Sequence, residues 1–228
     1  MFSELCGSAS LRFDFMIPVI LFDLDNTLYT EESGIFDLID QRMSEWLISR
    51  LNVPESEVRE FRKKYFLQYG TTLRGLMLHH QVNPMEFLRF VHDVPVHDFL
   101  SVDLELRRTL EGITSRKIIF TNSDAAHANR ILDALGVRDL FEKIFDIEAM
   151  GYIPKPNQEA YASVLEYAKV SAPECLLIDD MERNLKPARD LGMRTVLIGD
   201  GETVEDSLHV IANIKELNQV LSKIAAQK

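Results

Sequence analysis

Short, uninterrupted apolar runs that each end in polar residues constrain the fold of this chain more than any other feature. The first run, Val19-Ile-Leu-Phe, leads directly into Asp23-Leu-Asp-Asn-Thr. Similar runs are Lys117-Ile-Ile-Phe, Cys175-Leu-Leu-Ile and Thr195-Val-Leu-Ile, with a weaker copy at Lys143-Ile-Phe-Asp. Apolar runs without alternation are typical of strands that are buried on both faces. We therefore predict strands at these five places.

Helical patterns separate the predicted strands. Apolar residues recur three or four positions apart in the segments 128–135, 161–168 and 185–191. Gly136 and Gly192 follow two of these segments, as glycine commonly follows a helix. Strands that alternate with helices, and that are apolar throughout, indicate an α/β fold built on a doubly wound parallel sheet.

The connection between the first two strands is too long for a single crossover helix. It holds 95 residues between Asp25 and Thr121, whereas a parallel crossover needs only about a dozen. Its apolar positions have helical spacing, so we predict an inserted all-helical domain at 29–101 on a core formed by 16–28 and 102–228. The expected helices contain 35–47, start at Pro54, and cover 73–80 and 84–91, with a return helix at 103–112.

The N-terminal residues and the composition bear on the expected cellular location of the protein. Residues 1–15 precede Met16 and have neither a basic segment nor an apolar stretch of signal-peptide length, so we predict a dispensable extension. An arm that packs on the body is the alternative. No run approaches the ~18 apolar residues of a membrane helix, and Cys6 and Cys175 cannot form a disulfide framework. We expect a cytoplasmic monomer or homodimer that does not bind membranes.

The net charge of the chain argues against one class of binding partner. With 25 basic and 36 acidic residues, the formal net charge is −11. A chain with this charge is a poor ligand for a polyanion, which argues against binding to a nucleic acid polymer. We therefore expect a small-molecule partner.

Polar residues follow three of the predicted strands. They are Asp23 and Asp25, Thr121 and Asn122, and Asp179 and Asp180. In open α/β sheets ligands bind in the crevice beyond the carboxyl ends of the strands, so we expect these side chains to lie together. Four carboxylates in one crevice repel one another unless a divalent cation lies among them, and oxygen ligands with open positions favour Mg²⁺.

The spacing of the first two carboxylates indicates a reaction. Residues i and i+2 of an extended segment point to the same side, so one of Asp23 and Asp25 can attack while the other handles the proton. Thr121 and Asn122 supply neutral donors that suit phosphate oxygens, although they also suit a helix cap. Lys155, between two prolines in GYIPKPN, adds a cation that can hold a phosphoryl group.

These residues resemble the four motifs of the haloacid dehalogenase (HAD) superfamily of phosphohydrolases, over about Val19 to Asp200. The motifs are DLDNT at 23–27, Thr121-Asn122, Lys155 in PKP and Asp179-Asp180 before MERN. The resemblance implies a phosphoaspartate mechanism in which Asp23 is the nucleophile and Asp25 the general acid and then base, while Thr121 and Lys155 hold the phosphoryl group. It also implies Mg²⁺ bound by Asp23, by the backbone carbonyl of Asp25 and by Asp180 with Asp179 beside it, and a helical C1 cap.

A narrower resemblance concerns the substrate. DLDNTLY, YGTTLRGL at 69–76, VHDFL at 96–100 and FTNSDAAHANRIL at 120–132 resemble the pyrimidine 5′-nucleotidase branch. This implies a nucleoside 5′-monophosphate, pyrimidine before purine, with sugar phosphates or other small phosphomonoesters as the alternative. Tyr69 and Arg74 are the candidates to contact the base, because a flat ring stacks on an aromatic side chain and arginine donates to a carbonyl edge.

Three other functions fit the residues less well. A receiver-type phosphorylation switch lacks an acid two residues after the phosphorylated aspartate and has no room for a 95-residue insertion. A dehalogenase of the same superfamily would need neither Mg²⁺ nor an acid at Asp25. A protein that only binds partners would be expected to have lost Asp23, Asp25 or Lys155, and none of these is missing.

Further expectations concern titration, histidines and the end of the chain. To donate and then accept a proton, Asp25 needs a pKa nearer neutrality than that of a free aspartate. His92, His97 and His127 have no partner that the sequence identifies, so surface or packing roles are predicted. The apolar stripe from Ile211 to Leu221 predicts a C-terminal helix that docks on the body.

Overall fold

The computed structural model describes residues 17–199 and 208–226. The predicted extension at 1–15 and Cys6 lie outside the described residues. Within them, every helix is too short or too polar to cross a membrane.

In the described part of the chain, six parallel strands form one sheet in the order β3-β2-β1-β4-β5-β6. The strands are β1 (Val19–Phe22), β2 (Arg116–Phe120), β3 (Lys143–Phe145), β4 (Cys175–Asp179), β5 (Arg194–Ile198) and β6 (Leu208–Ile211). The prediction of a doubly wound parallel sheet is confirmed, including the weak strand β3. The order reverses at β1, which lies between β2 and β4. A reversal of this kind opens a crevice at the carboxyl ends of the central strands.

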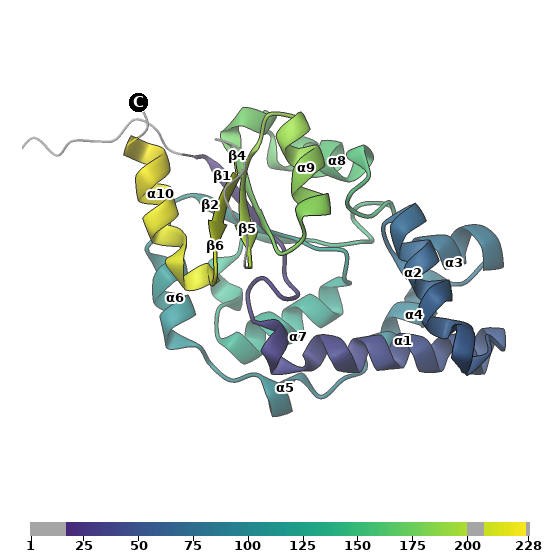
Figure 1. Ribbon diagram of the computed structural model, residues 1–228. Coiled ribbons are helices and arrows are strands. Elements are labelled where there is room, and N and C mark those ends of the chain that lie inside the picture. Colours follow the sequence, from purple (N-terminus) through teal and green to yellow (C-terminus); the bar gives the residue numbers. More distant parts are fainter. Residues whose placement is uncertain (1–16, 200–207, 227–228) are drawn as a thin grey trace, which may run out of the picture.

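Helices cover both faces of the sheet, which explains why the strand sequences are apolar throughout. Ile20 and Phe22 pack on one face with α6 (Leu104–Glu111), α7 (Ala125–Leu135) and α10 (Leu217–Ala226). Val19 and Leu21 pack on the other face with α8 (Gln158–Ala168) and α9 (Glu182–Asp190). All four strand side chains are completely buried, and the two helical layers are visible on either side of the sheet in Figure 1.

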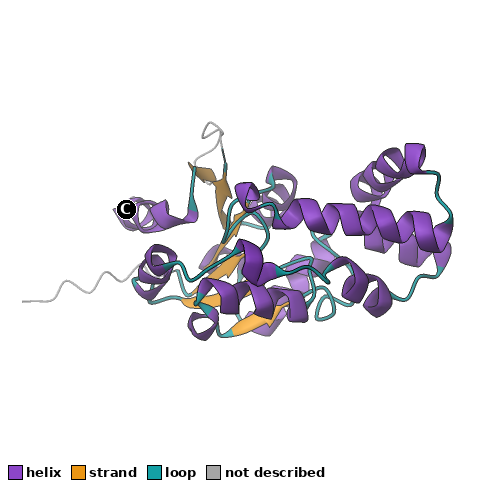
Figure 2. Ribbon diagram, turned by 90° about the horizontal axis from the view of Figure 1, so that it is seen from below, coloured by secondary structure: helices purple, strands orange, loops and turns teal. Residues whose placement is uncertain are grey.

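The long connection after β1 is helical, as predicted. It contains α1 (Ile35–Leu51), α2 (Val58–Tyr69), α3 (Thr72–His80), α4 (Pro84–Val91) and the single turn α5 (Val96–Phe99). α1 packs on α4, α2 packs on α3, and Figures 1 and 2 show α1–α4 gathered beside the sheet. α3 and α4 occupy the predicted segments. The chain after Pro54 first forms a 3-10 turn at Glu55–Glu57, so α2 begins four residues later than predicted.

Local signals explain where these helices start. The side chain of Thr71 accepts a hydrogen bond from the N–H of Arg74 at the start of α3. The side chain of Asn83 does the same for Met85 and Glu86, with Pro84 in the first turn of α4. Both residues satisfy backbone donors that a helix N-terminus would otherwise leave unpaired. We call residues 29–101 the helical insertion; its limits as a separate domain stay a prediction.

The end of the chain differs from its predicted structure. Ile211 belongs to the edge strand β6, where it pairs with Ile198, and not to a helix. A 3-10 turn at Ile214–Glu216 follows, and α10 begins only at Leu217. The stripe does dock on the body through Ile214 and Leu217, which are buried in the core. Pairing with β5 overrides the helical spacing at Ile211, because tertiary contacts commonly outweigh local pattern in short segments.

Candidate active site

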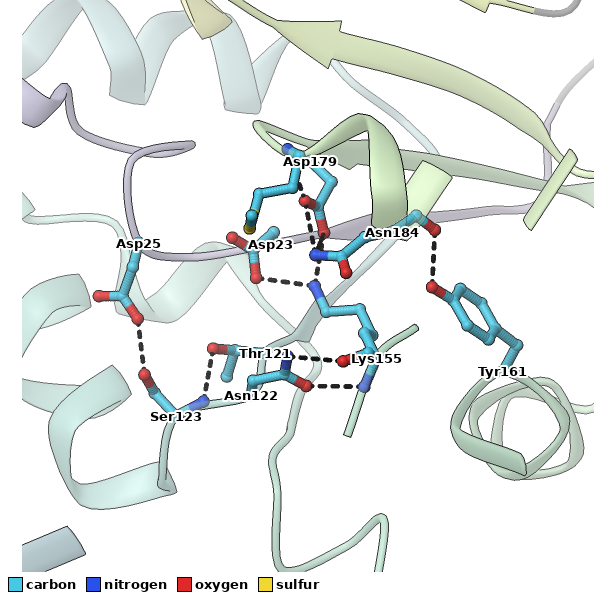
Figure 3. Close-up of polar contacts among 10 residues, drawn as sticks. Asp23, Asp25, Thr121, Asn122, Ser123, Lys155, Tyr161, Asp179 and Asn184 are labelled. Carbon is cyan, nitrogen blue, oxygen red and sulfur yellow. Dashed lines mark hydrogen bonds and ion pairs between the residues drawn. The ribbon is translucent and has the colours of Figure 1, made fainter. Parts of the chain in front are cut away.

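The carboxyl ends of β1, β2 and β4 bring the predicted site residues together. Asp23 follows β1, Thr121 follows β2, Asp179 ends β4, and Lys155 reaches them from the connection between β3 and α8. Figure 3 shows these side chains pointing into one space, with Asp25 on its other side. The crevice predicted from the strand ends is therefore present at the point where the strand order reverses.

Lys155 is completely buried and links two carboxylates. Its Nζ donates to Asp23 Oδ1 at 2.8 Å and to Asp179 Oδ2 at 2.6 Å, and it lies 5.0 Å from the centre of the Phe120 ring. Burial alone would lower the pKa of Lys155, but the charges and hydrogen bonds of Asp179 and Asp23 outweigh it and raise this pKa above its ordinary value. Lys155 is therefore a fixed positive charge at the centre of the site.

Asn122 holds Lys155 by its backbone. Asn122 Nδ2 donates to the carbonyl of Lys155 at 3.2 Å, and the N–H of Lys155 donates to Asn122 Oδ1 at 2.9 Å. Each end of the amide thus has one backbone partner, and Nδ2 keeps a second hydrogen, so the use of Asn122 as a donor to substrate stays a prediction. Thr121 is buried beside it, and its Oγ1 accepts from the N–H of Ser123 at 3.0 Å, which leaves the hydroxyl hydrogen free to donate.

Three of the four predicted metal-binding aspartates form an acidic cluster. Asp23, Asp179 and Asp180 each offer one oxygen, and these oxygens lie within 4.8 Å of one another. Asp179 is held from behind, because Oδ1 accepts from the N–H of Met181 and from Asn184 Nδ2, both at 2.9 Å. The carboxylate of Asp180 makes no hydrogen bond or ion pair with any described residue. These carboxylate oxygens, together with the Asp23 carboxylate, of which Oδ1 accepts from Lys155, are the hard ligands that a cation such as Mg²⁺ prefers.

The electrostatics of this cluster also fit a cation. Burial, together with the charge of Asp179, raises the pKa of Asp180 to about 7. Burial raises the pKa of Asp23 well above its ordinary value too, and Lys155 only partly opposes this. The acids disfavour ionisation because they are buried and mutually repulsive, and a divalent cation among them would reverse that preference.

Asp25 lies apart from the acidic cluster in a neutral and basic environment. Its Oδ1 accepts from the Tyr29 hydroxyl at 2.7 Å and from His127 Nε2 at 2.9 Å, and its Oδ2 accepts from Ser123 Oγ at 2.6 Å. Burial by itself raises the pKa of Asp25, but the charge of His127 and the three hydrogen bonds outweigh it and hold this pKa well below its ordinary value. The expectation of a pKa near neutrality is therefore wrong for the protein without substrate.

His127 and His92 form more polar contacts near Asp25 than the sequence predicted. His127 and His92 are buried, and their rings stack with centroids 4.4 Å apart and an interplanar angle of 18°. His92 Nδ1 lies 2.5 Å from Asp124 Oδ2. Their predicted surface or packing roles thus need correction, because both rings belong to a hydrogen-bonded chain that reaches Asp25. His97 is exposed, as expected.

Three polar residues of the site were not singled out from the sequence, namely Tyr29, Ser123 and Asn184, and His127 was given only a surface or packing role. Ser123 directly follows Thr121-Asn122, and His127 lies in the first turn of α7. The first turn of a helix that follows a central strand faces the crevice, so a search for polar side chains there would have found His127. Tyr29 and Asn184 carry no such signal, because their contacts depend on where the chain turns.

The helical insertion reaches the site at the turn between α2 and α3. Gly70 has φ +90°, and an added Cβ there would lie 2.8 Å from the carbonyl oxygen of Lys155, so only glycine fits this close approach. Arg74, in the first turn of α3, is half-buried, and its guanidinium makes no hydrogen bond or ion pair with the described residues. The hydroxyl of Tyr69 contacts His79 Nε2 at 2.5 Å.

α2 also contacts α9, the helix that follows the acidic cluster. Arg183 places its guanidinium carbon 4.2 Å from the centre of the Phe66 ring and donates to the Phe66 carbonyl at 3.2 Å. A separate cavity of about 610 Å³ lies between the segments 26–33 and 99–104. Asp23, Lys155 and Asp180 are not among its lining residues, so this cavity is distinct from the crevice at the strand ends.

Comparison with known proteins gives a consistent family. A family model described as a haloacid dehalogenase-like hydrolase matches residues 17–192. "Phosphate metabolism protein 8" of Saccharomyces cerevisiae is 30% identical over 212 residues, which cover 86% of this chain and 64% of that protein. The chain thus spans less than two thirds of this relative. "Glyceraldehyde 3-phosphate phosphatase" of Methanocaldococcus jannaschii is 22% identical over 237 residues, which cover 92% of this chain and 99% of that protein.

Solved structures share the fold. The HAD-hydrolase YfnB from Bacillus subtilis, in a form bound to magnesium, has a TM-score of 0.62 at 18% identity and covers 91% of this chain and 100% of its own. A 2-haloacid dehalogenase from Pseudomonas syringae has a TM-score of 0.58 at 23% identity and covers 92% of this chain and 100% of its own. At these identities the likeness concerns the fold alone, and it includes proteins of different chemistry.

Proposed function

The chain belongs to the haloacid dehalogenase-like hydrolases, and from this membership and the geometry of the crevice we propose that it is a Mg²⁺-dependent phosphomonoester hydrolase with Asp23 as its nucleophile. The observation that carries the proposal is the second carboxylate, Asp25. It lies at the same strand end as Asp23, outside the acidic cluster, and is held by three donors. A dehalogenase has no leaving oxygen to protonate and no use for an acid at this position.

The proposed reaction has two halves. Asp23 attacks phosphorus, the bond from phosphorus to the ester oxygen breaks, and protonated Asp25 gives its proton to that oxygen. A water molecule then attacks the phosphoaspartate, Asp25 takes a proton from the water, and inorganic phosphate and the Asp23 carboxylate are released. In the free protein Asp25 is ionised, because its pKa is low. The negative charge of a bound phosphoryl group opposes this shift and helps Asp25 to take up the proton that it donates.

The other residues bind and orient the phosphoryl group. Lys155 Nζ, already beside Asp23, supplies a positive charge, and the free hydroxyl hydrogen of Thr121 supplies a donor. Asp23 and Asp180 would hold Mg²⁺, with Asp179 orienting Lys155 behind them and the Asp25 carbonyl as a further ligand by resemblance. When bound, the cation neutralises the transferring group and polarises its oxygens.

For the leaving group we propose a nucleoside 5′-monophosphate, with pyrimidines preferred. The turn at Gly70 brings the start of α3 against the Lys155 loop, and the guanidinium of Arg74 there has no hydrogen-bond or ion-pair partner among the described residues. A guanidinium in this place suits the carbonyl edge of a base, and the Tyr69 ring nearby in sequence suits stacking. A small sugar phosphate is the second candidate, favoured by the relative named for glyceraldehyde 3-phosphate.

One experiment tests both levels of the proposal. The chain is treated with a chelator, Mg²⁺ is added back, and kcat/KM is measured for UMP, CMP, purine nucleotides, glyceraldehyde 3-phosphate and glycerol phosphate, with 2-chloropropionate as the dehalogenase substrate. We expect phosphate release that requires Mg²⁺, and a phosphorylated peptide containing Asp23 after an acid quench. Chloride release without phosphate release, or full activity without a divalent cation, would contradict the proposal.

The substrate class is tested with a matched pair of arginine variants. Arg74→Ala is expected to lower kcat/KM for UMP and CMP more than for glycerol phosphate. Arg89→Ala, an exposed arginine of α4, is the control and should leave both unchanged. If UMP and CMP are no better than the sugar phosphates, or if Arg74→Ala affects all substrates alike, the nucleotide assignment is wrong while the phosphatase assignment stands.

A further inference from the structure

The hydrogen bonds of Asp25 distinguish its two oxygens. A carboxylate oxygen has two lone pairs in its plane, and both lone pairs of Oδ1 are used, by the Tyr29 hydroxyl at 2.7 Å and His127 Nε2 at 2.9 Å. Among the described residues, Oδ2 accepts from Ser123 Oγ alone, at 2.6 Å, which leaves it one lone pair. The carboxylate is held at both ends, so it cannot turn to exchange the two oxygens without breaking these contacts.

We propose that His127 is a positioning residue for Asp25, that His92 from the helical insertion holds His127, and that Oδ2 is the oxygen of Asp25 that exchanges the proton with substrate. This inference rests on the proposed function. In the first half-reaction, Oδ2–H gives its proton to the leaving oxygen as the bond to phosphorus breaks. In the second, Oδ2 takes a proton from the attacking water as the bond between phosphorus and Asp23 breaks, which restores the protonated form.

His127 is built to make one polar contact. Its ring is completely buried, and its Nδ1 has no hydrogen-bond partner in the described part of the chain. Because an ionised carboxylate only accepts, Nε2 carries the hydrogen that it donates to Asp25. A buried nitrogen without a partner is costly, because no hydrogen bond replaces the one it would make with water. A histidine kept only for packing would not need its donor aimed at the acid, so the arrangement favours a role in holding Asp25.

His92 and Asp124 hold His127 on its other side. Asp124 is the N-cap of α7: its Oδ1 accepts from the N–H of His127 at 2.8 Å, and its Oδ2 lies 2.5 Å from His92 Nδ1. The ring of His92 stacks on that of His127, and the carbonyl of His92 accepts from Arg130 at 2.6 Å. His92 directly follows α4, so the helical insertion contributes to the placement of the acid and not only to substrate recognition.

Two substitutions separate the hydrogen bond of His127 from its packing. His127→Phe keeps a ring that can stack on His92 but removes the donor, whereas His127→Gln removes the ring but keeps an N–H that can reach Asp25. Each is assayed with Mg²⁺ on glycerol phosphate, whose leaving oxygen needs a proton, and on p-nitrophenyl phosphate, whose leaving group needs little help. Thermal melting of every variant checks the fold, and His97→Ala, an exposed histidine of α5, is the control.

We expect His127→Phe to lower kcat for glycerol phosphate about 100-fold, the scale of a misplaced catalytic group, with KM nearly unchanged and a much smaller loss on the aryl ester. His127→Gln should recover most of this loss, and His92→Ala should give a weaker version of the same pattern. The reverse order, with His127→Phe active and His127→Gln impaired, would assign a packing role and overturn the proposal, as would equal losses on both esters. A wild-type protein that hydrolyses neither ester would overturn the proposed function, and this inference with it.

Discussion

Asp23 and Asp25 follow the same strand two residues apart, yet their carboxylates lie in opposite environments. Asp23 faces Lys155 and the acidic cluster, and burial among like charges raises its pKa. Asp25 faces His127, Ser123 and Tyr29, which lower its pKa against the same effect of burial. The partners come from 132 residues away for Lys155 and 102 residues away for His127. Two identical side chains acquire different chemistry because distant segments meet at one strand end.

The largest loss of activity is expected from a substitution of Asp23. Asp23→Asn keeps the shape of the side chain and an oxygen for Lys155 but cannot form the phosphoaspartate, so turnover should fall by several orders of magnitude. The melting temperature should change little, because a neutral amide replaces a buried acid. The exposed Asp37→Asn on α1 is the control for both measurements. A folded Asp23→Asn variant that keeps more than a small fraction of the wild-type activity would exclude Asp23 as the nucleophile.

Removing Lys155 tests what its charge does for the acidic cluster. Lys155→Met leaves Asp23 and Asp179 buried without their cation, which should lower the free energy of unfolding by about 3 to 5 kcal/mol at neutral pH. Asp23 then holds its proton more tightly in the folded chain than in the unfolded chain, so the loss should shrink as the pH falls. Urea unfolding at pH 5 and pH 8 measures this.

The exposed Lys63→Met on α2 is the matched control for this variant and should show no such loss. A Lys155→Met protein that is as stable as the wild type at pH 8 would show that the acids do not depend on this lysine.

Within the acidic cluster, Asp180 and Asp179 are expected to have different roles, and a substitution of Asp180 tests this. Its carboxylate has no hydrogen-bond or ion-pair partner within residues 17–199 and 208–226, whereas Asp179 is held by Lys155, Asn184 and the N–H of Met181. Asp180→Ala should therefore raise the Mg²⁺ concentration for half-maximal activity by at least about tenfold, a typical cost of disturbing a metal site. Glu159→Ala, an exposed acid at the start of α8, should not. An unchanged Mg²⁺ requirement would remove Asp180 from the proposed ligands.

The smallest expected effect concerns the pH dependence of stability on the Asp25 side. Burial lowers the pKa of His92 below its ordinary value of 6.5, and hydrogen bonds lower that of Asp124 to about 2 although burial opposes them. Both shifts make the folded chain bind fewer protons than the unfolded chain. Stability from His92 is thus present above pH 6.5 and is lost as the pH falls below it, and that from Asp124 is lost below pH 3.8.

His92→Asn can still donate to Asp124 but does not titrate, so the slope of unfolding free energy between pH 6.5 and pH 5 should become flatter. His97→Asn, which alters an exposed histidine, should leave that slope as it is in the wild type. An identical slope in wild type and His92→Asn would show that His92 is not held neutral by its surroundings.

Much of the fold could be predicted, because a strand that is buried on both faces has an apolar residue at every position. Val19-Ile-Leu-Phe and its copies are apolar at every position, and a parallel sheet covered by helices is the arrangement that hides all of them. The insertion was also predictable, because the 95 residues between Asp25 and Thr121 are far more than a single crossover connection needs. Ile211 was misassigned because its spacing fits a helix while its pairing with Ile198 decides for a strand.

The apolar runs alone show which strand ends carry Asp23, Asp25, Asp179 and Asp180, and that these residues share one edge of the sheet, because the carboxyl ends of parallel strands lie at the same edge. The contacts of each side chain, including those of Lys155 from the connection between β3 and α8, depend on the tertiary structure. The side chain of Asn122 bonds to the backbone of Lys155, and His92 of the helical insertion stacks on His127. A pKa depends on partners within a few ångströms, and two of the three side chains that donate to Asp25 lie about a hundred residues away along the chain. The periodicity of a sequence records which side of an element is buried, but it does not record which distant atoms the fold places against it.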